Sequence, residues 1–305
     1  MRIVFMGTPS IAETCLRKLY EGGCEVVGVY TKPDTPKNRG MKLAMSEVKA
    51  FAVSVGLPVF QPESFRDEDA VAQLQALKPD LILVVAYGKI LPQRVLDIPP
   101  HGCINIHGSL LPALRGSGPI QWSILNGLDE TGVTAMYMAA EMDAGDMIAV
   151  RKTPIEPLET SQELMDRLAP LAADLLLETV RQVADGTVTR TPQDPSKVTF
   201  APMLTKEMAP IDWTLLPRKI VDHVRGLVPW PVATTELWGK KFKIYRVEYT
   251  EKTAKEAPGT PLSLTKRGLE MACGGGQVVV ITQLQAEGGK RMSAPDYFRG
   301  HPIEW

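Results

Sequence analysis

The chain has 305 residues, of which 44% are hydrophobic and 23% charged, and it contains 25 Gly and 25 Pro. This length predicts two domains, because single hydrophobic cores rarely grow beyond ~250–300 residues, and the composition excludes a disordered, collagen-like or coiled-coil chain. Residues 1–200 carry a net charge of −5 and residues 201–305 a net charge of +4, which hints at a polyanionic partner but is equally consistent with chance scatter.

No stretch of the sequence approaches the ~18 unbroken apolar residues of a membrane span. The first residues, Met1–Gly7, also lack the character of a secretory or transit signal. We therefore expect a cytoplasmic protein with no membrane association. The four cysteines form no C-x-x-C pair and are expected to be thiols packed as small apolar residues.

Strands and helices are predicted to alternate over the first 190 residues. Short apolar runs predict strands at Ile3–Met6, Val26–Tyr30, Pro58–Phe60, Leu81–Val85, Cys103–Ile106 and Gly132–Met138. Helical spacing of apolar residues predicts helices that begin at Ser10, that run through Val48–Val55 and over Ala70–Leu77, and a long helix over Ser161–Ala184. Ser10, three residues before Glu13, predicts a capping box on the first helix. The alternation predicts an α/β fold with a doubly wound, mostly parallel sheet.

The character of the sequence changes after residue 190. A segment rich in proline and polar residues predicts a linker, and several short strands in fewer than 100 residues then predict a small β-barrel. The predicted strands are Val232–Leu237, Lys241–Val247, Leu269–Ala272 and Val278–Leu284. We expect a catalytic domain over residues 1–190, a linker over 191–207 and a second domain over 208–305.

The densest polar segment is His101–Pro112. Side chains alternate along a strand, so Asn105 and His107 are expected on one face, where the strand ends and Gly108 begins a loop. An amide beside an imidazole suits the stabilisation of an oxyanion. The competing interpretation is a histidine satisfied by a neighbouring backbone carbonyl, and a lone Asn-x-His pair favours it.

Other chemistries find less support in the sequence. His101 and His107 are about 20 Å apart at ~3.3 Å per strand residue, too far to share a metal ion, and no metal is expected. Ser109 lacks the G-x-S-x-G turn of a serine hydrolase, and Gly7–Ser10 matches neither the dinucleotide fingerprint nor a Walker A loop. On spacing alone, the cluster around Asp143 indicates a capped turn.

The combination of motifs is more specific than any one of them. These motifs are Cys103–Pro112, Arg115-Gly116, Pro119–Trp122 and Asp143–Met147, together with Met6–Pro9, Tyr30–Asp34, Val84–Gly88, Leu204–Glu207, Ile211–Trp213, Pro229–Pro231 and Pro258–Thr260. On these motifs, which run across nearly the whole chain, the sequence resembles the folate-dependent formyltransferases. The resemblance implies a doubly wound N-terminal domain followed by a C-terminal domain similar to an OB barrel.

The resemblance also implies an activity, in which a formyl group moves from 10-formyltetrahydrofolate to the amino group of methionine on initiator tRNA. It places Asn105, His107 and Asp143 at the family's catalytic positions. Amine attack on the formyl carbon gives a tetrahedral intermediate, whose oxyanion Asn105 and a protonated His107 can stabilise. Asp143 would pair with His107 or organise a water that carries the proton to the leaving nitrogen. The folate-lining segment of the family matches Ser109, Leu110, Leu111 and Pro112.

A tRNA substrate requires basic surface. The polar loop over residues 31–43 matches the family segment expected to meet the acceptor end of tRNA. Together with the charge of the C-terminal third, it predicts RNA contacts at Arg39, Lys42, Lys206, Lys241 and Lys243. Strand alternation places Lys241 and Lys243 on one face and Arg246 on the other, unless a bulge intervenes.

Two other functions stay open at this point. The first is a formyltransferase for a small-molecule amine such as a nucleotide amino sugar, which would differ mainly in the C-terminal third. The second is a non-catalytic RNA-binding module on a degenerate enzyme fold, against which the intact Asn105, His107 and Asp143 argue. We expect the protein to be a monomer.

Overall fold

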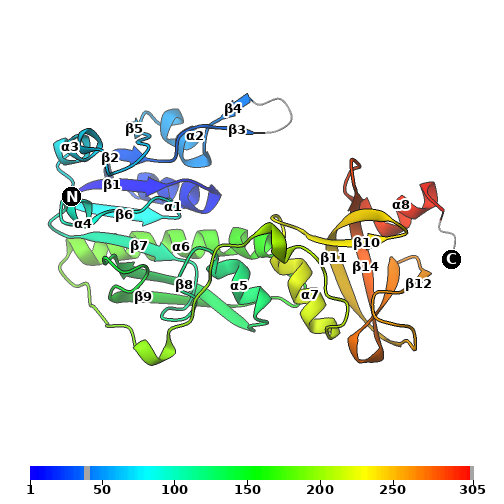
Figure 1. Cartoon of the computed structure of the whole chain (residues 1–305). Coiled ribbons are helices and arrows are strands. Elements are labelled where there is room, and N and C mark those ends of the chain that lie inside the picture. Colours follow the sequence, from blue (N-terminus) through cyan, green and yellow to red (C-terminus); the bar gives the residue numbers. More distant parts are fainter. Residues whose placement is uncertain (38–41, 303–305) are drawn as a thin grey trace. The chain divides into compact units, whose positions relative to one another are not determined.

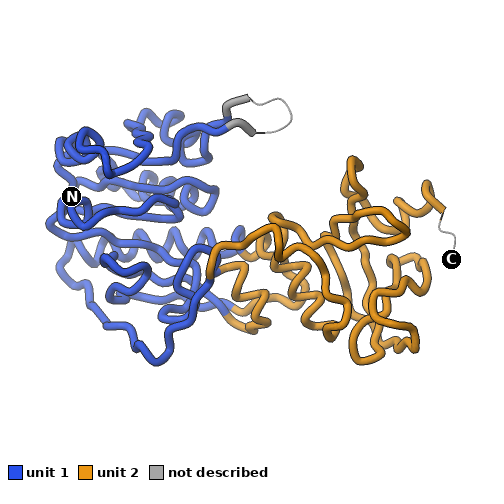
Figure 2. Tube along the Cα trace, in the orientation of Figure 1, with its two compact units in different colours: residues 1–119, 131–153, 165–201 blue, residues 120–130, 154–164, 202–305 orange. Residues whose placement is uncertain are grey.

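The structure is a computed structural model and describes residues 1–37 and 42–302. The chain divides into two compact units (Figure 2). Unit 1 comprises residues 1–119, 131–153 and 165–201, and unit 2 comprises residues 120–130, 154–164 and 202–305. Two short segments that precede residue 165 in the sequence therefore belong to the unit that contains the C-terminal third.

Unit 1 is built on a seven-stranded sheet with the order β5-β2-β1-β6-β7-β8-β9 (Figure 1). Its strands are β1 (Arg2–Gly7), β2 (Glu25–Tyr30), β5 (Val59–Phe60), β6 (Leu81–Val85), β7 (Cys103–His107), β8 (Glu130–Tyr137) and β9 (Met147–Pro154). The pairs from β5 to β7 are parallel, whereas β7 and β8 are antiparallel. The mostly parallel sheet expected from the sequence is confirmed.

Helices complete this unit and cover the sheet with apolar side chains. They are α1 (Ser10–Glu21), α2 (Glu47–Ser54), α3 (Glu68–Ala76), α4 (Gln93–Leu96) and α6 (Ser161–Ala184), which belongs to unit 1 from Met165 onward. Helix α5 (Pro119–Leu125) belongs to unit 2 from Ile120 onward. Alternate residues of β1 and β6, such as Met6 and Ile82, join Leu74 of α3 and Val95 of α4 in one buried cluster. Unbroken apolar strands are thus explained by a sheet buried on both faces.

Several details differ from the sequence predictions. The capping box on α1 is wrong, because the helix is preceded by Pro9 in an extended conformation and Ser10 is already the first helical residue. A serine inside the first turn cannot reach the backbone N–H that an N-cap side chain satisfies. The basic loop contains a short hairpin of β3 (Thr35–Lys37) and β4 (Lys42–Ala44). Strand β9 and helices α4 and α5 were not predicted.

Unit 2 is built on an antiparallel sheet with the order β10-β11-β14-β13-β12, and β15 pairs with β14. The strands are β10 (Ala233–Leu237), β11 (Lys240–Thr253), β12 (Pro261–Leu264), β13 (Leu269–Cys273), β14 (Gln277–Ala286) and β15 (Met292–Ser293), and the helices are α7 (Pro217–Gly226) and α8 (Ala294–Gly300). Within the described part of the chain, no pairing joins the edge strands β10 and β12. The antiparallel sheet is present, but a closed OB-like barrel is not confirmed.

Helix α7 holds the two short segments of unit 2 by hydrogen bonds. Arg225 Nη1 donates to the carbonyls of Glu156 and Glu159 over 3.0 and 3.1 Å, and its Nε and Nη2 reach Asp222 Oδ1 at 2.9 and 2.8 Å. Arg218 donates to Asp129 over 2.8 Å. The Asp222–Arg225 pair is buried, and its guanidinium ties α7 to segment 154–164.

Short 3-10 turns are found at Pro195–Lys197, Lys206–Met208 and Gly274–Gly276. In the ranges 1–37 and 42–302, no helix is long and apolar enough to cross a membrane. All four cysteines are free, as expected, and burial raises the pKa of Cys103 to about 12, which keeps it a protonated thiol near neutral pH.

Candidate active site

Strand β7 carries the two residues on which the predicted site depends. In the register of the sheet, Asn105 lies opposite Val84 of β6 and Met136 of β8, and His107 lies opposite Thr134. Asn105 and His107 therefore share one face of the strand, as predicted from alternation. Asn105 is half-buried, and within the described part of the chain its side-chain amide has no hydrogen-bond partner.

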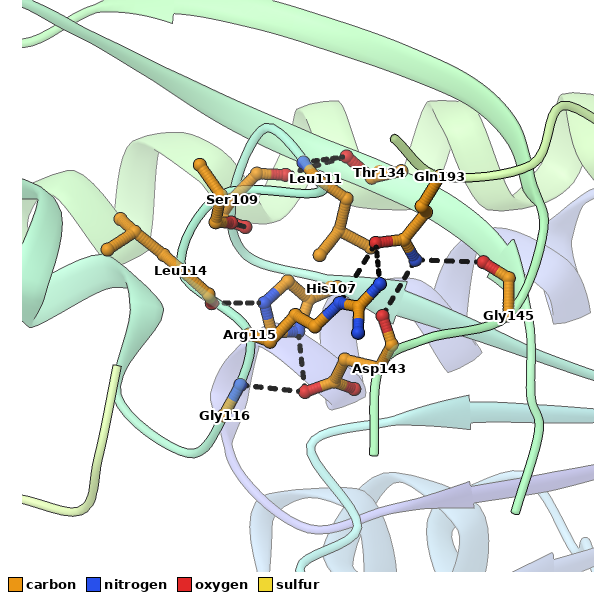
Figure 3. A network of polar contacts seen from close by, with 11 residues as sticks. His107, Ser109, Leu111, Leu114, Arg115, Gly116, Thr134, Asp143, Gly145 and Gln193 are labelled. Carbon is orange, nitrogen blue, oxygen red and sulfur yellow. Dashed lines mark hydrogen bonds and ion pairs between the residues drawn. The ribbon is translucent and has the colours of Figure 1, made fainter. Parts of the chain in front are cut away.

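Each ring nitrogen of His107 faces an oxygen atom (Figure 3). Its side chain is only 5% exposed, Nε2 lies 2.8 Å from the carbonyl oxygen of Leu114, and Nδ1 lies 3.7 Å from Asp143 Oδ2. A carbonyl only accepts, so Nε2 carries a proton, and Nδ1 of the neutral ring is left facing the carboxylate. A second proton on Nδ1 would turn this approach into an ion pair. The interpretation of His107 as a histidine satisfied by a backbone carbonyl is thus correct for Nε2 alone.

Asp143 lies in a tight turn after β8. Its backbone has φ +53°, and its Oδ2 accepts a hydrogen bond of 2.8 Å from the backbone N–H of Gly116. Two residues on, a Cβ at Gly145 would lie 1.9 Å from the carbonyl oxygen of Tyr137, so only glycine fits there. The turn is therefore pressed against the end of β8, and this contact brings Asp143 to His107 although the two are 36 residues apart.

The predicted folate-lining segment follows β7 directly. Ser109 is buried, and its Oγ donates to the carbonyl of Ala113 over 2.6 Å. Thr134 Oγ1 donates to the Ser109 carbonyl over 2.7 Å and accepts from the Leu111 N–H over 3.2 Å, which fixes the turn against β8. The Ser109 hydroxyl thus serves the turn and does not contact His107. Leu111 is buried, whereas Leu110 and Pro112 are half-buried.

Two polar residues at this site had not been given a role from the sequence. Arg115 is buried and donates from Nε and Nη2 to Gln193 Oε1 at 3.0 and 2.9 Å, while its Nη1 pairs with Glu141 at 3.1 Å. Gln193 Nε2 donates to the carbonyls of Asp143 and Gly145. Gln193 lies in the segment predicted as a linker, and nothing in its local sequence signals these contacts.

The predicted RNA-contacting residues lie away from the His107 site in sequence and are described separately. Lys206 is exposed and opens a 3-10 turn. In β11, Phe242 and Ile244 face the core of unit 2, so the exposed Lys241 and Lys243 face outward. Arg39 lies outside the described residues, and Lys42 begins β4, where its side chain is not described.

Register shifts on both sides of Arg246 interrupt the alternation of β11. Ile244 and Val247 are both core residues, so Tyr245 and Arg246 are both displaced toward the outer face. The bulge that the sequence analysis allowed for is present, and it places the cation of Arg246 on the outer face. Arg291 stacks on Tyr245 with its guanidinium carbon 4.4 Å from the ring centre, which adds a second.

No group of three or more His, Cys, Asp or Glu side chains in residues 1–37 and 42–302 is arranged to hold a metal ion. A mostly parallel sheet whose β7 carries an amide and an imidazole on one face, with a carboxylate facing the imidazole, agrees with the resemblance stated above. A model described as "Formyl transferase" matches residues 1–180, and one described as "Formyl transferase, C-terminal domain" matches residues 203–302. The chain belongs to the formyl transferase family.

Within this family, the chain is similar over its whole length to methionyl-tRNA formyltransferases. It is 47% identical over 304 residues to the protein of Geobacter sulfurreducens, covering 100% of this chain and 95% of the relative. Identity is 43% over 304 residues to that of Alkaliphilus oremlandii, with coverages of 100% and 98%. It is 45% over 303 residues to that of Bacillus velezensis, with coverages of 99% and 96%.

Solved structures extend the likeness in fold. HypX from Aquifex aeolicus, crystallised with tetrahydrofolic acid, aligns with a TM-score of 0.69 at 20% identity over 98% of this chain, which spans about half (47%) of HypX. The sugar 3N-formyltransferase WlaRD, crystallised in the presence of dTDP and 5-N-formyl-THF, aligns with a TM-score of 0.69 at 14% identity, over 92% of this chain and 96% of WlaRD. At such identities the likeness concerns the fold.

Proposed function

We propose that this chain transfers the formyl group of 10-formyltetrahydrofolate to the amino group of methionine on initiator tRNA, a reaction of translation initiation. The observation that carries the proposal is full-length similarity to methionyl-tRNA formyltransferases at 43–47% identity, in both the part with the site and the part with the basic sheet. Because charged tRNA is the proposed substrate, we place the reaction in the cytoplasm.

The proposed mechanism is direct attack of the amine on the formyl carbon, through a tetrahedral intermediate. The unpartnered Asn105 amide is suited to donate to the oxygen on which negative charge develops. His107 shares its face of β7 and, when doubly protonated, adds positive charge there. Asp143 Oδ2 faces Nδ1 at 3.7 Å, and its half-buried carboxylate can pass a proton through water.

For the folate, we propose that the pterin end lies against the turn formed by Ser109, Leu110, Leu111 and Pro112. Thr134 holds this turn from both sides, which makes its apolar surface and backbone groups a fixed wall next to His107. The loop after β6 would form the opposite wall. Thr8 Oγ1 donates to the Tyr87 carbonyl over 3.1 Å and ties that loop to the end of β1.

For the tRNA, we propose contacts at Arg39, Lys42, Lys206, Lys241 and Lys243, with the C-terminal region as an OB-like RNA-binding domain. The outward lysines of β11 support this role, and Tyr245, Arg246 and Arg291 enlarge the surface with a ring and two cations. We retain the division into residues 1–190, 191–207 and 208–305, and a monomeric state, as proposals.

A formyl-transfer assay with one preparation tests this function. Offered 10-formyltetrahydrofolate, the protein should formylate methionyl initiator tRNA faster than methionyl elongator tRNA, and it should leave a nucleotide amino sugar unmodified. Formylation of the amino sugar alone would establish the small-molecule alternative. Binding of tRNA without transfer to any amine would instead indicate an RNA-binding module without catalysis.

A further inference from the structure

The segment between α6 and residue 202 is hydrogen-bonded to the loops beside His107. Thr191 pairs with Met147 in both directions, with N–H···O distances of 2.9 and 2.8 Å, directly after the Asp143 turn. Eight residues later, Thr199 Oγ1 accepts from the Leu114 N–H over 2.9 Å, and the Thr199 carbonyl accepts from the Arg115 N–H over 2.9 Å. Segment 191–201 thus crosses both loops that supply partners to His107.

Gln193 makes the contact between these anchor points (Figure 3). Its Nε2 donates to the carbonyls of Asp143 and Gly145 over 2.7 and 2.8 Å, and its Oε1 accepts twice from Arg115. Guanidinium groups only donate and carbonyls only accept, so a single orientation of the amide satisfies all four hydrogen bonds. Both hydrogens and both lone pairs of the Gln193 amide are used.

The Asp143 turn needs such a restraint. A non-glycine residue at φ +53° is held in a conformation that its side chain disfavours, and it persists only where the surroundings impose it. In this conformation of the turn, the carboxylate accepts from the Gly116 N–H and lies 3.7 Å from His107 Nδ1. Loss of the Gln193 amide would leave the carbonyls of Asp143 and Gly145, and the Nε and Nη2 of Arg115, without this hydrogen-bond partner.

We propose that segment 191–201 sets the position of both groups that face the ring nitrogens of His107, and that Gln193 is the positioning residue that holds Asp143 in place for formyl transfer. Thr199 holds the Leu114 side by the same principle. Gln193 itself does not contact His107, so its action passes through the Asp143 turn. This inference rests on the proposed function, because transfer to methionyl-tRNA is its readout.

The experiment compares wild type, Gln193→Ala, Gln193→Met, Asp143→Ala and the double variant Gln193→Ala/Asp143→Ala. The control is Asp194→Ala, the adjacent residue, whose exposed carboxylate accepts only from Ser196 and Lys197 in its own turn. We expect Gln193→Ala to lower kcat by on the order of 10- to 10²-fold, as for a misplaced catalytic group, with the KM for the folate within about twofold. Asp194→Ala should retain wild-type kcat.

The double variant separates positioning from general support of the fold. If Gln193 acts through Asp143, adding Gln193→Ala to Asp143→Ala should change kcat by less than about twofold, because contacting residues in one pathway are not additive. Full multiplication of the two losses, or wild-type kcat in a folded Gln193→Ala or Gln193→Met protein, would overturn the proposal. A wild-type protein that formylates no tRNA would contradict the proposed function instead.

Discussion

Two buried acid–base pairs, one in each unit, have opposite geometries. Asp222 Oδ1 accepts two hydrogen bonds of 2.8–2.9 Å from Arg225, both side chains are under 10% exposed, and the guanidinium also satisfies two carbonyls. Asp143 instead lies 3.7 Å from His107, beyond hydrogen-bond distance, and its side chain is 14% exposed. Burial closes the tight pair to a substrate, although Asp222 Oδ2 has no hydrogen-bond partner within the described residues. The loose pair is the one to which we assign a catalytic role, and its two side chains are not hydrogen-bonded to each other.

The largest expected effect is on stability, at the tight pair. Arg225→Met leaves the buried Asp222 without its two short hydrogen bonds, with only Arg218 Nε at 3.7 Å, which should lower the free energy of unfolding by ~3–5 kcal/mol. All described tryptophans belong to unit 2, so urea unfolding followed by tryptophan fluorescence reports on this unit. The exposed pair Arg299–Asp296 provides the control, and Arg299→Met should cost ~0–1 kcal/mol. Equal losses in the two variants would contradict the distinction.

At the loose pair, the effect should appear in turnover. Asn105→Ala, His107→Ala and Asp143→Ala are each expected to lower kcat by ~10²-fold or more, the scale of a lost oxyanion donor or proton-transfer group, while folate affinity changes less. Steady-state kinetics with methionyl initiator tRNA measures this. Wild-type turnover in any folded variant would remove that residue from the catalytic set.

The same substitution at both acids sharpens the contrast. Asp143→Asn should lower kcat strongly and leave the unfolding transition close to wild type, because Asp143 makes one backbone hydrogen bond and no short ion pair. Asp222→Asn should shift the unfolding transition to lower urea and leave kcat nearly unchanged wherever the protein is folded. A stability loss for Asp143→Asn equal to that for Asp222→Asn would show that both pairs are structural.

Exposed cations on β11 form a third class, with smaller effects. Lys241→Glu/Lys243→Glu should weaken tRNA binding about 10-fold near physiological salt and reduce the slope of log K against log salt by ~1–2, because two phosphate contacts are lost. Filter binding across a salt series measures both. The control Lys255→Glu/Lys266→Glu makes the same change of net charge in exposed loops of the same unit. An equal loss of tRNA affinity in this control would show that the effect comes from overall charge.

The smallest expected effect concerns pH and His223 of α7. Burial lowers the pKa of His223 below its ordinary value, and its Nε2 has no hydrogen-bond partner within the described residues. The unfolded chain therefore binds the proton more readily, so stability is lost as the pH falls through ~6.5. Urea unfolding at pH 7.5 and 5.5 should show a smaller difference in His223→Gln than in wild type. An unchanged difference would assign the pH dependence to other groups.

Much of unit 1 could be predicted because its sequence pattern is local. The unbroken run Leu81–Val85 and the alternation at Asn105 and His107 follow directly from a sheet covered on both faces. Strand β9 could not be found, because its residues Met147–Pro154 mix polar and apolar side chains without a strict period. The capping box failed because Pro9 moves the helix start by one residue.

The site was predicted only where the residues are close in sequence or the resemblance supplied them. Gln193 hydrogen-bonds to Asp143 and Gly145 across about fifty residues, and no periodicity or spacing records such a contact. The role of Arg115 is hidden for the same reason, since its partner Gln193 is 78 residues away. In β11, the face reached by Arg246 depended on a bulge that alternation alone could not specify.

A C-terminal region cut at residue 202 would leave part of its own core behind. Trp122, Leu125 and Leu158 precede this cut in the sequence, yet they pack against the buried cluster of unit 2. A fragment that ends near residue 198 would expose these apolar side chains, and the complementary fragment would carry a gap where they belong. Exchange of C-terminal modules between formyltransferases, in evolution or in a chimaera, would therefore have to transfer three separate stretches of sequence together.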